Sequence, residues 1–133
     1  MRAALLLGLL YFAVVFTFAF GMGVARTLIV APRLGPAVAV LLEVPVLVIA
    51  SWLTARRLLR HRRLTLGEAT VMGATAFLLT MASEAALAGE LRGQAVSEWA
   101  TDLVTPLGLV GLMGQLMFGA MPLLLLGSRS KSA

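Results

Sequence analysis

Two carboxylates, Glu43 and Glu84, lie inside long apolar stretches of the sequence. A charged side chain at the centre of a bilayer costs about 2.5–3.5 kcal/mol or more, so a residue of this kind usually has a structural or chemical role. Hydroxyl, amide and guanidinium side chains lie close enough in the sequence to join them. The candidate intramembrane polar cluster consists of Glu43, Glu84, Thr80, Ser83, Gln115, Arg26 and Arg33.

Three kinds of chemistry are open to this cluster. In the first, a carboxylate pairs with Arg26 or Arg33, or with Ser, Thr and Gln side chains across helices, and the pair fixes the bundle. In the second, the two carboxylates share a proton or bind a cation and form the coupling site of a transporter. In the third, they bind a hard metal ion, for which two carboxylates and a glutamine are few ligands. We favour the structural pair and expect no metal.

Composition excludes several other reaction classes. The chain has no Cys and one His, His61, which lies in the basic run of residues 56–63 outside the apolar stretches. Axial haem ligation and a Ser-His-Asp triad both need a His that is placed beside the reacting group. The one Lys, Lys131, is in the C-terminal tail, so a Schiff-base lysine within the membrane is excluded. We therefore predict that the protein is not an enzyme and holds no cofactor.

The elements that position the cluster are predicted to be membrane helices. Of the 133 residues, 60% are hydrophobic and 13% are charged, whereas a soluble domain has about 45–50% apolar and about 25% charged residues. A membrane helix needs roughly 20 apolar residues. We predict an all-α polytopic membrane protein with one four-helix domain. Its four spans are residues 4–24, 36–54, 66–89 and 106–126.

The depth of the two carboxylates follows from these spans. Span two starts about seven residues before Glu43, and span three ends about five residues after Glu84. At about 1.5 Å per residue, both carboxylates lie roughly 7–11 Å from the same membrane surface. We therefore expect them to share one site.

Helix-end signals support the boundaries of the spans. Thr65 and Glu68 have the spacing of a capping box, in which each residue bonds a free backbone N–H of the other. Thr105 precedes Pro106, which places a capping residue before a proline at the first helical position. Residues 95–103 carry apolar side chains on one helical face, so we predict a short helix that lies on the outer surface of the membrane.

Lys and Arg residues predict the orientation. If the N-terminus is cytoplasmic, eight of the 11 basic residues lie on the cytoplasmic side and three, Arg26, Arg33 and Arg92, lie outside. This bias places both termini in the cytoplasm, and we predict the bacterial inner membrane. The basic run then contacts membrane lipids, and no nucleic-acid partner is needed. The residues expected to contact anionic lipid are Arg56, Arg57, Arg60, Arg62 and Arg63.

Small residues predict where helices meet. Gly108, Gly111 and Gly114 recur every three residues and leave a narrow groove for a helix of this bundle or of another protein. Our leading functional prediction is an accessory or scaffolding protein of the inner membrane. Its partners would be other membrane helices, in a homo-oligomer or a larger complex. The alternative is a proton- or cation-coupled transporter or channel that uses Glu43 and Glu84.

Several segments carry a resemblance to known proteins. These segments are spread along most of the chain: residues 26–35, the triplet Glu43-Val44-Pro45, the basic run, Glu84, and the start of span four at Thr105-Pro106-Leu107-Gly108. In these segments the chain resembles a family of small four-helix bacterial membrane proteins to which no activity is attached. The small multidrug resistance transporters differ, because their key carboxylate lies in the first span, where this chain has none.

Overall fold

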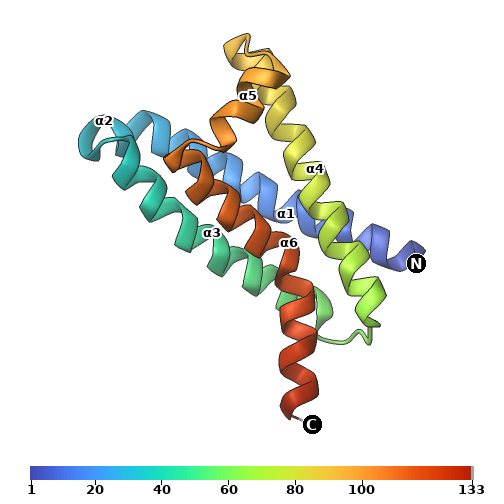
Figure 1. Ribbon diagram of the computed structural model, residues 1–133. Helices are drawn as coiled ribbons and strands as arrows, with labels where there is room; N and C mark the ends of the chain where they lie inside the picture. Colours follow the sequence, from blue (N-terminus) through green and yellow to red (C-terminus); the bar gives the residue numbers. More distant parts are fainter. Residues whose placement is uncertain (133) are drawn as a thin grey trace.

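The computed structural model describes residues 1–132, and these form helices joined by short connections (Figure 1). No strand occurs among them. Helix α1 continues without a break through a π-helical turn into α2. The elements are α1 (Arg2–Ala25), the π turn (Arg26–Val30), α2 (Ala31–Leu34), α3 (Pro36–Leu59), α4 (Leu66–Arg92), α5 (Val96–Leu103) and α6 (Pro106–Ser132).

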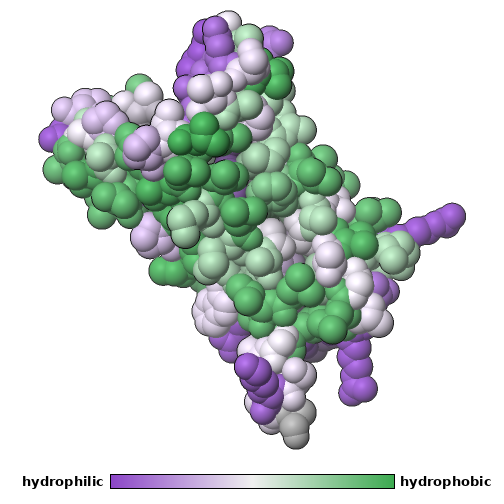
Figure 2. All heavy atoms as spheres, in the orientation of Figure 1, coloured by the Kyte–Doolittle hydropathy of each residue, from purple (hydrophilic) through white to green (hydrophobic). Residues whose placement is uncertain are grey.

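Four helices are long and apolar enough to cross a membrane: the continuous helix Arg2–Leu34, α3, α4 and α6. The surface agrees with this, because Figure 2 shows a broad hydrophobic area with hydrophilic groups toward its ends. Helices suit this environment because they satisfy their backbone hydrogen bonds internally. The predicted class, an all-α multi-pass membrane protein, is confirmed.

The predicted helix starts are also confirmed. The Glu68 N–H donates to Thr65 Oγ1 at 3.2 Å, and the Thr65 N–H donates to Glu68 Oε2 at 2.9 Å, which completes the capping box of α4. At the start of α6, the Gly108 N–H donates to Thr105 Oγ1 at 3.2 Å. The short helix expected near residues 95–103 is α5.

The first connection differs from the prediction. Residues 25–35 were expected to link two spans, but the helix runs on to Leu34 and ends at Gly35, whose φ of +87° suits glycine. Pro32 has no N–H to donate within this helix. The π turn lies just before it, and there the Ala31 N–H bonds to the carbonyl of Arg26. The chain thus stays helical until Gly35, where the backbone leaves the helical region.

The four long helices form a ring in which each packs against two others. α1 packs along α3 and α4, and α6 packs along the same two helices, so α1 and α6 face each other across the ring. Both termini and the α3–α4 connection lie at one end of the bundle, which we call the terminal end (Figure 1). α2 and α5 lie at the opposite end, which we call the α5 end (Figure 1).

The packed core occupies the half of the bundle toward the terminal end. A Cβ on Gly8 would lie 2.7 Å from the carbonyl oxygen of Met72, and a Cβ on Gly73 would collide with the carbonyl oxygen of Gly119. These glycines let α1 and α6 approach the backbone of α4 closely. The buried core residues are Leu7, Tyr11, Val15, Ala55, Leu59, Met72, Ala76, Phe118, Met121 and Leu125.

Candidate functional site

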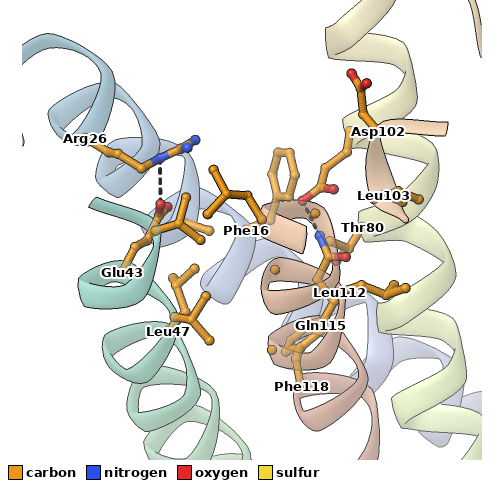
Figure 3. A pocket seen from close by; sticks show the side chains of 18 of the residues that line it. Phe16, Arg26, Glu43, Leu47, Thr80, Asp102, Leu103, Leu112, Gln115 and Phe118 are labelled. Carbon is orange, nitrogen blue, oxygen red and sulfur yellow. Dashed lines mark hydrogen bonds and ion pairs between the residues drawn. The ribbon is translucent and has the colours of Figure 1, made fainter. Parts of the chain in front are cut away.

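A cavity of about 410 Å³ lies in the half of the bundle toward the α5 end. Pockets that bind small molecules have volumes of about 300–1,000 Å³. The walls come from α1, α3, α4 and α6, and α5 contributes Trp99, Asp102 and Leu103 (Figure 3 shows the last two). The polar and charged side chains that line it are Arg26, Glu43, Ser51, Thr80, Glu84, Arg92, Asp102 and Gln115.

One wall of the cavity carries an ion pair. Arg26, the first residue of the π turn, places Nε 2.6 Å from Oε2 of Glu43 on α3 (Figure 3). The side chain of Glu43 is 13% exposed and that of Arg26 is 39% exposed, so the pair is half-buried. Arg33, the other predicted partner, is exposed and does not line the cavity. The π turn that carries Arg26 packs against α3, whereas Arg33 lies in α2 with its side chain exposed.

The opposite wall carries the second carboxylate. Gln115 on α6 donates from Nε2 to Oε1 of Glu84 on α4 at 2.6 Å (Figure 3). Thr80, one turn before Glu84, is buried, lines the cavity and donates its hydroxyl to the carbonyl of Ala76 at 2.9 Å. Ser83 is half-buried and lies outside the cavity lining. The two carboxylates therefore face one cavity from different helices.

The two carboxylates have different partners. Glu43 has a guanidinium, whereas within residues 1–132 no cationic group pairs with Glu84, whose hydrogen-bond donor is a neutral amide. Oε1 of Gln115 is buried and has no hydrogen-bond partner. Buried polar atoms are normally hydrogen-bonded, so this oxygen is an acceptor beside a carboxylate that lacks its usual donor.

The glycines of α6 also line the cavity. A Cβ on Gly108 would collide with the carbonyl oxygen of Asp102, and a Cβ on Gly114 would lie 3.0 Å from Val44 Cγ1. Gly111, between them, has no other atom within 4 Å of that position and lines the cavity. The glycine face of α6 is therefore turned into the bundle, against α5, α3 and the cavity.

Sequence reasoning missed the contribution of α5. Trp99 and Asp102 line the cavity with Arg92, although the sequence suggested only a helix lying on the membrane. Gln94 Nε2 donates to Asp102 Oδ2 at 2.5 Å, which ties α5 to the connection from α4. Thr105 Oγ1 donates to the Asp102 carbonyl at 2.7 Å, which holds the end of α5 against the start of α6. These contacts depend on two tight turns, and the apolar periodicity of α5 carries no signal for them.

Phe118 lines the cavity on the side of the packed core, and Tyr11 contacts it from α1. The Tyr11 hydroxyl donates to the Phe118 carbonyl at 2.8 Å, and the two rings have centroids 4.5 Å apart. Pro122, four residues after Phe118, has no N–H to donate to that carbonyl. Tyr11 thus satisfies the backbone group that the proline leaves free, and it ties α1 to α6 across the ring.

The basic run lies at the other end of the bundle from the cavity. The guanidinium carbon of Arg56 lies 5.1 Å from the ring centroid of Trp52, within the range of a cation–π contact. The other basic side chains extend into the surroundings. The exposed residues of the run are Arg56, Arg57, Arg60, Arg62 and Arg63.

Comparison of the chain with protein-family models, curated proteins and solved structures found no match in any of the three. The class of protein is set by the helices: a multi-pass α-helical membrane protein. Its candidate site is a cavity between the spanning helices that is lined by both apolar and charged side chains.

Proposed function

We propose that the protein is a small carrier of the bacterial inner membrane that binds a solute in its cavity and couples this binding to a proton or cation. The observation that supports the proposal is that Glu43 and Glu84, from two different spans, line the same cavity. Ionisable residues that face a cavity within a membrane protein mark substrate paths, ion paths and proton relays.

The different partners of the carboxylates suggest different roles. Glu43 is held by Arg26 at 2.6 Å, so it supports the wall and keeps that arginine in place. Glu84 has only the amide of Gln115 at 2.6 Å, and a neutral amide does not compensate a carboxylate charge. We therefore assign the exchangeable proton or cation to Glu84.

The shape of the bundle suits a carrier in one of its two conformations. The cavity reaches from the α5 end to Phe118, and the buried core fills the remaining half. With the termini in the cytoplasm, as the excess of basic residues at the terminal end favours, the cavity faces outward. Transport then requires that the contact between Tyr11 and Phe118 opens while the α5 end closes.

An accessory or scaffolding role is the second hypothesis. Its motivation was the glycine face of α6, and that face lines the cavity and contacts α3 and α5. The cavity therefore supports a carrier better than it supports an interface for a partner protein. An accessory subunit would copurify with a partner after gentle detergent extraction and crosslinking, whereas a carrier works without one.

A proton-flux measurement tests the proposal. The protein is reconstituted in liposomes that enclose a pH-sensitive dye, and an applied membrane potential drives protons or cations across. We expect a pH-dependent flux that is lost in Glu84→Gln. Glu90→Gln is the matched control, because Glu90 is an exposed carboxylate on the same helix and lies outside the cavity lining. Equal flux in the parent, in Glu84→Gln and in empty liposomes would refute the proposal.

A further inference from the structure

We propose that the solute of this cavity is a monovalent organic ammonium ion, with an apolar body and a cationic nitrogen that carries N–H groups. The inference rests on the proposed function, since it names the chemical class that the carrier binds. Three features support it: the hydrogen-bonding groups at Glu84, the net charge of the lining, and the aromatic walls.

The wall around Glu84 offers hydrogen-bond acceptors and few donors. Glu84 is a carboxylate that receives one bond, from Gln115. Oε1 of Gln115 is buried without a partner. The Thr80 hydroxyl uses its hydrogen on the Ala76 carbonyl, so its oxygen can only accept further bonds. An ammonium group has several N–H donors and no acceptor, and it is complementary to these three oxygens.

The net charge of the cavity lining favours a ligand that carries a single positive charge. Arg26 compensates Glu43 in the ion pair. Toward the α5 end, Arg92 and Asp102 contribute one charge of each sign. Glu84 remains without a cationic partner among the described residues. A ligand with one positive charge therefore neutralises the site, whereas a dication or an anion leaves a net charge in a low-dielectric region.

The remaining walls suit an organic body. Phe16, Phe118 and Trp99 line the cavity with aliphatic side chains (Figure 3 shows Phe16 and Phe118). Aromatic faces attract organic cations by cation–π interaction. A bare metal ion fits less well, because it needs about six oxygen ligands. Within residues 1–132, no three His, Asp or Glu side chains are grouped so that they could hold one.

Binding of 2-phenylethylammonium to the purified full chain in nanodiscs tests the inference. The chain has two tryptophans. Trp99 lines the cavity, and Trp52 lies at the other end beside Arg56. A Trp52→Phe background therefore leaves one fluorescent reporter in the site. We expect saturable quenching by the ammonium ion, at least about tenfold weaker binding of the neutral 2-phenylethanol, and no saturable binding of 3-phenylpropionate or K⁺.

Variants locate the binding group. Glu84→Gln should weaken 2-phenylethylammonium binding at least about tenfold, the loss of one charge-assisted hydrogen bond. Thr80→Val keeps the side-chain shape and should weaken it less, and Glu90→Gln should leave it unchanged. Equal affinity for the alcohol and the ammonium ion would overturn the inference, and this comparison uses no substitution in the cavity. Unchanged affinity for 2-phenylethylammonium in a folded Glu84→Gln variant would also overturn the inference.

The flux assay tests the carrier, and the binding assay tests the solute class, so each proposal can be refuted without the other. Proton or cation flux that depends on Glu84, with no preference for the ammonium ion over the alcohol, overturns the solute class and supports the carrier. Ammonium binding that depends on Glu84, with no flux, supports the solute class of the cavity and refutes the carrier.

Discussion

The hydrogen bond between Tyr11 and the Phe118 carbonyl gives a quantitative prediction. Tyr11→Phe removes the hydroxyl and keeps the aromatic ring. The ring is fully buried against Phe118, and this packing is the same in the parent and in the variant. The carbonyl then has no donor, since Pro122 cannot supply one. Hydrogen bonds between membrane helices contribute about 0.6 kcal/mol on average and up to about 1.7. A buried carbonyl that loses its donor costs more than an average hydrogen bond, so the upper end of this range applies. We therefore expect the free energy of unfolding to fall by about 1.5 kcal/mol.

A double-mutant cycle with Pro122→Ala separates this hydrogen bond from other effects. Alanine at position 122 supplies the N–H that an α-helix directs at the Phe118 carbonyl. In that background, Tyr11→Phe should cost less than about 0.5 kcal/mol, which gives a coupling of about 1 kcal/mol between the two positions. The assay is reversible unfolding by SDS in mixed micelles, followed by circular dichroism. An equal cost of Tyr11→Phe in both backgrounds would refute the assignment of this carbonyl to Pro122.

Three further predictions follow from close contacts at other positions. Gly73→Ala should lower the free energy of unfolding by about 1–3 kcal/mol, because the added carbon meets the carbonyl of the facing helix, whereas Gly127→Ala, with open space around it, should be neutral or slightly stabilising in the same SDS titration. Arg26→Gln should lower the free energy of unfolding by about 1–2 kcal/mol, which lies between the values for exposed and buried ion pairs. Arg33→Gln should lower it by less than about 0.5 kcal/mol in the same SDS titration. Thr65→Ala should cost about 1 kcal/mol through loss of the cap of α4, and faster amide hydrogen exchange in its first turn would locate the effect. Equal losses of stability for Gly73→Ala and Gly127→Ala, or for Arg26→Gln and Arg33→Gln, would contradict the contacts described for these residues. Unchanged amide exchange in the first turn of α4 would contradict the Thr65 cap.

The fold was predictable because a bilayer limits what a chain can do. Apolar length alone marks four spanning helices, and local signals such as Thr65 and Glu68 mark where a helix begins. The predicted end of the first helix was wrong because Arg26 and Arg33 were taken to mark a connection, whereas the chain stays helical until Gly35. Charged residues mark where a helix leaves the apolar region, and they do not mark where the helix itself ends. Residue spacing therefore predicted the elements better than it predicted their ends.

The site was predictable in part. Counting residues from the span ends placed Glu43 and Glu84 at one depth, and both line the cavity with Thr80, Gln115 and Arg26. The choice of arginine depends on the path of the first helix, which spacing does not specify.

The direction of the glycine face and the contribution of α5 were not predictable in the same way. Periodicity shows that Gly108, Gly111 and Gly114 share one side of a helix, but what lies opposite depends on the order of the helices in the ring. Contacts between elements decide both features, and a single sequence carries no direct signal for such contacts.

Filling the cavity tests its role most directly, because it leaves every charge in place. Gly111 and Gly21 both have open space at the position of a Cβ, but Gly111 lines the cavity and Gly21 lies on an exposed face of α1. We expect that Gly111→Phe abolishes the pH-dependent flux across liposomes while the protein stays folded, and that Gly21→Phe retains the parent flux. Parent-like flux in a folded Gly111→Phe variant would contradict the proposal that the solute and its coupled ion pass through this cavity.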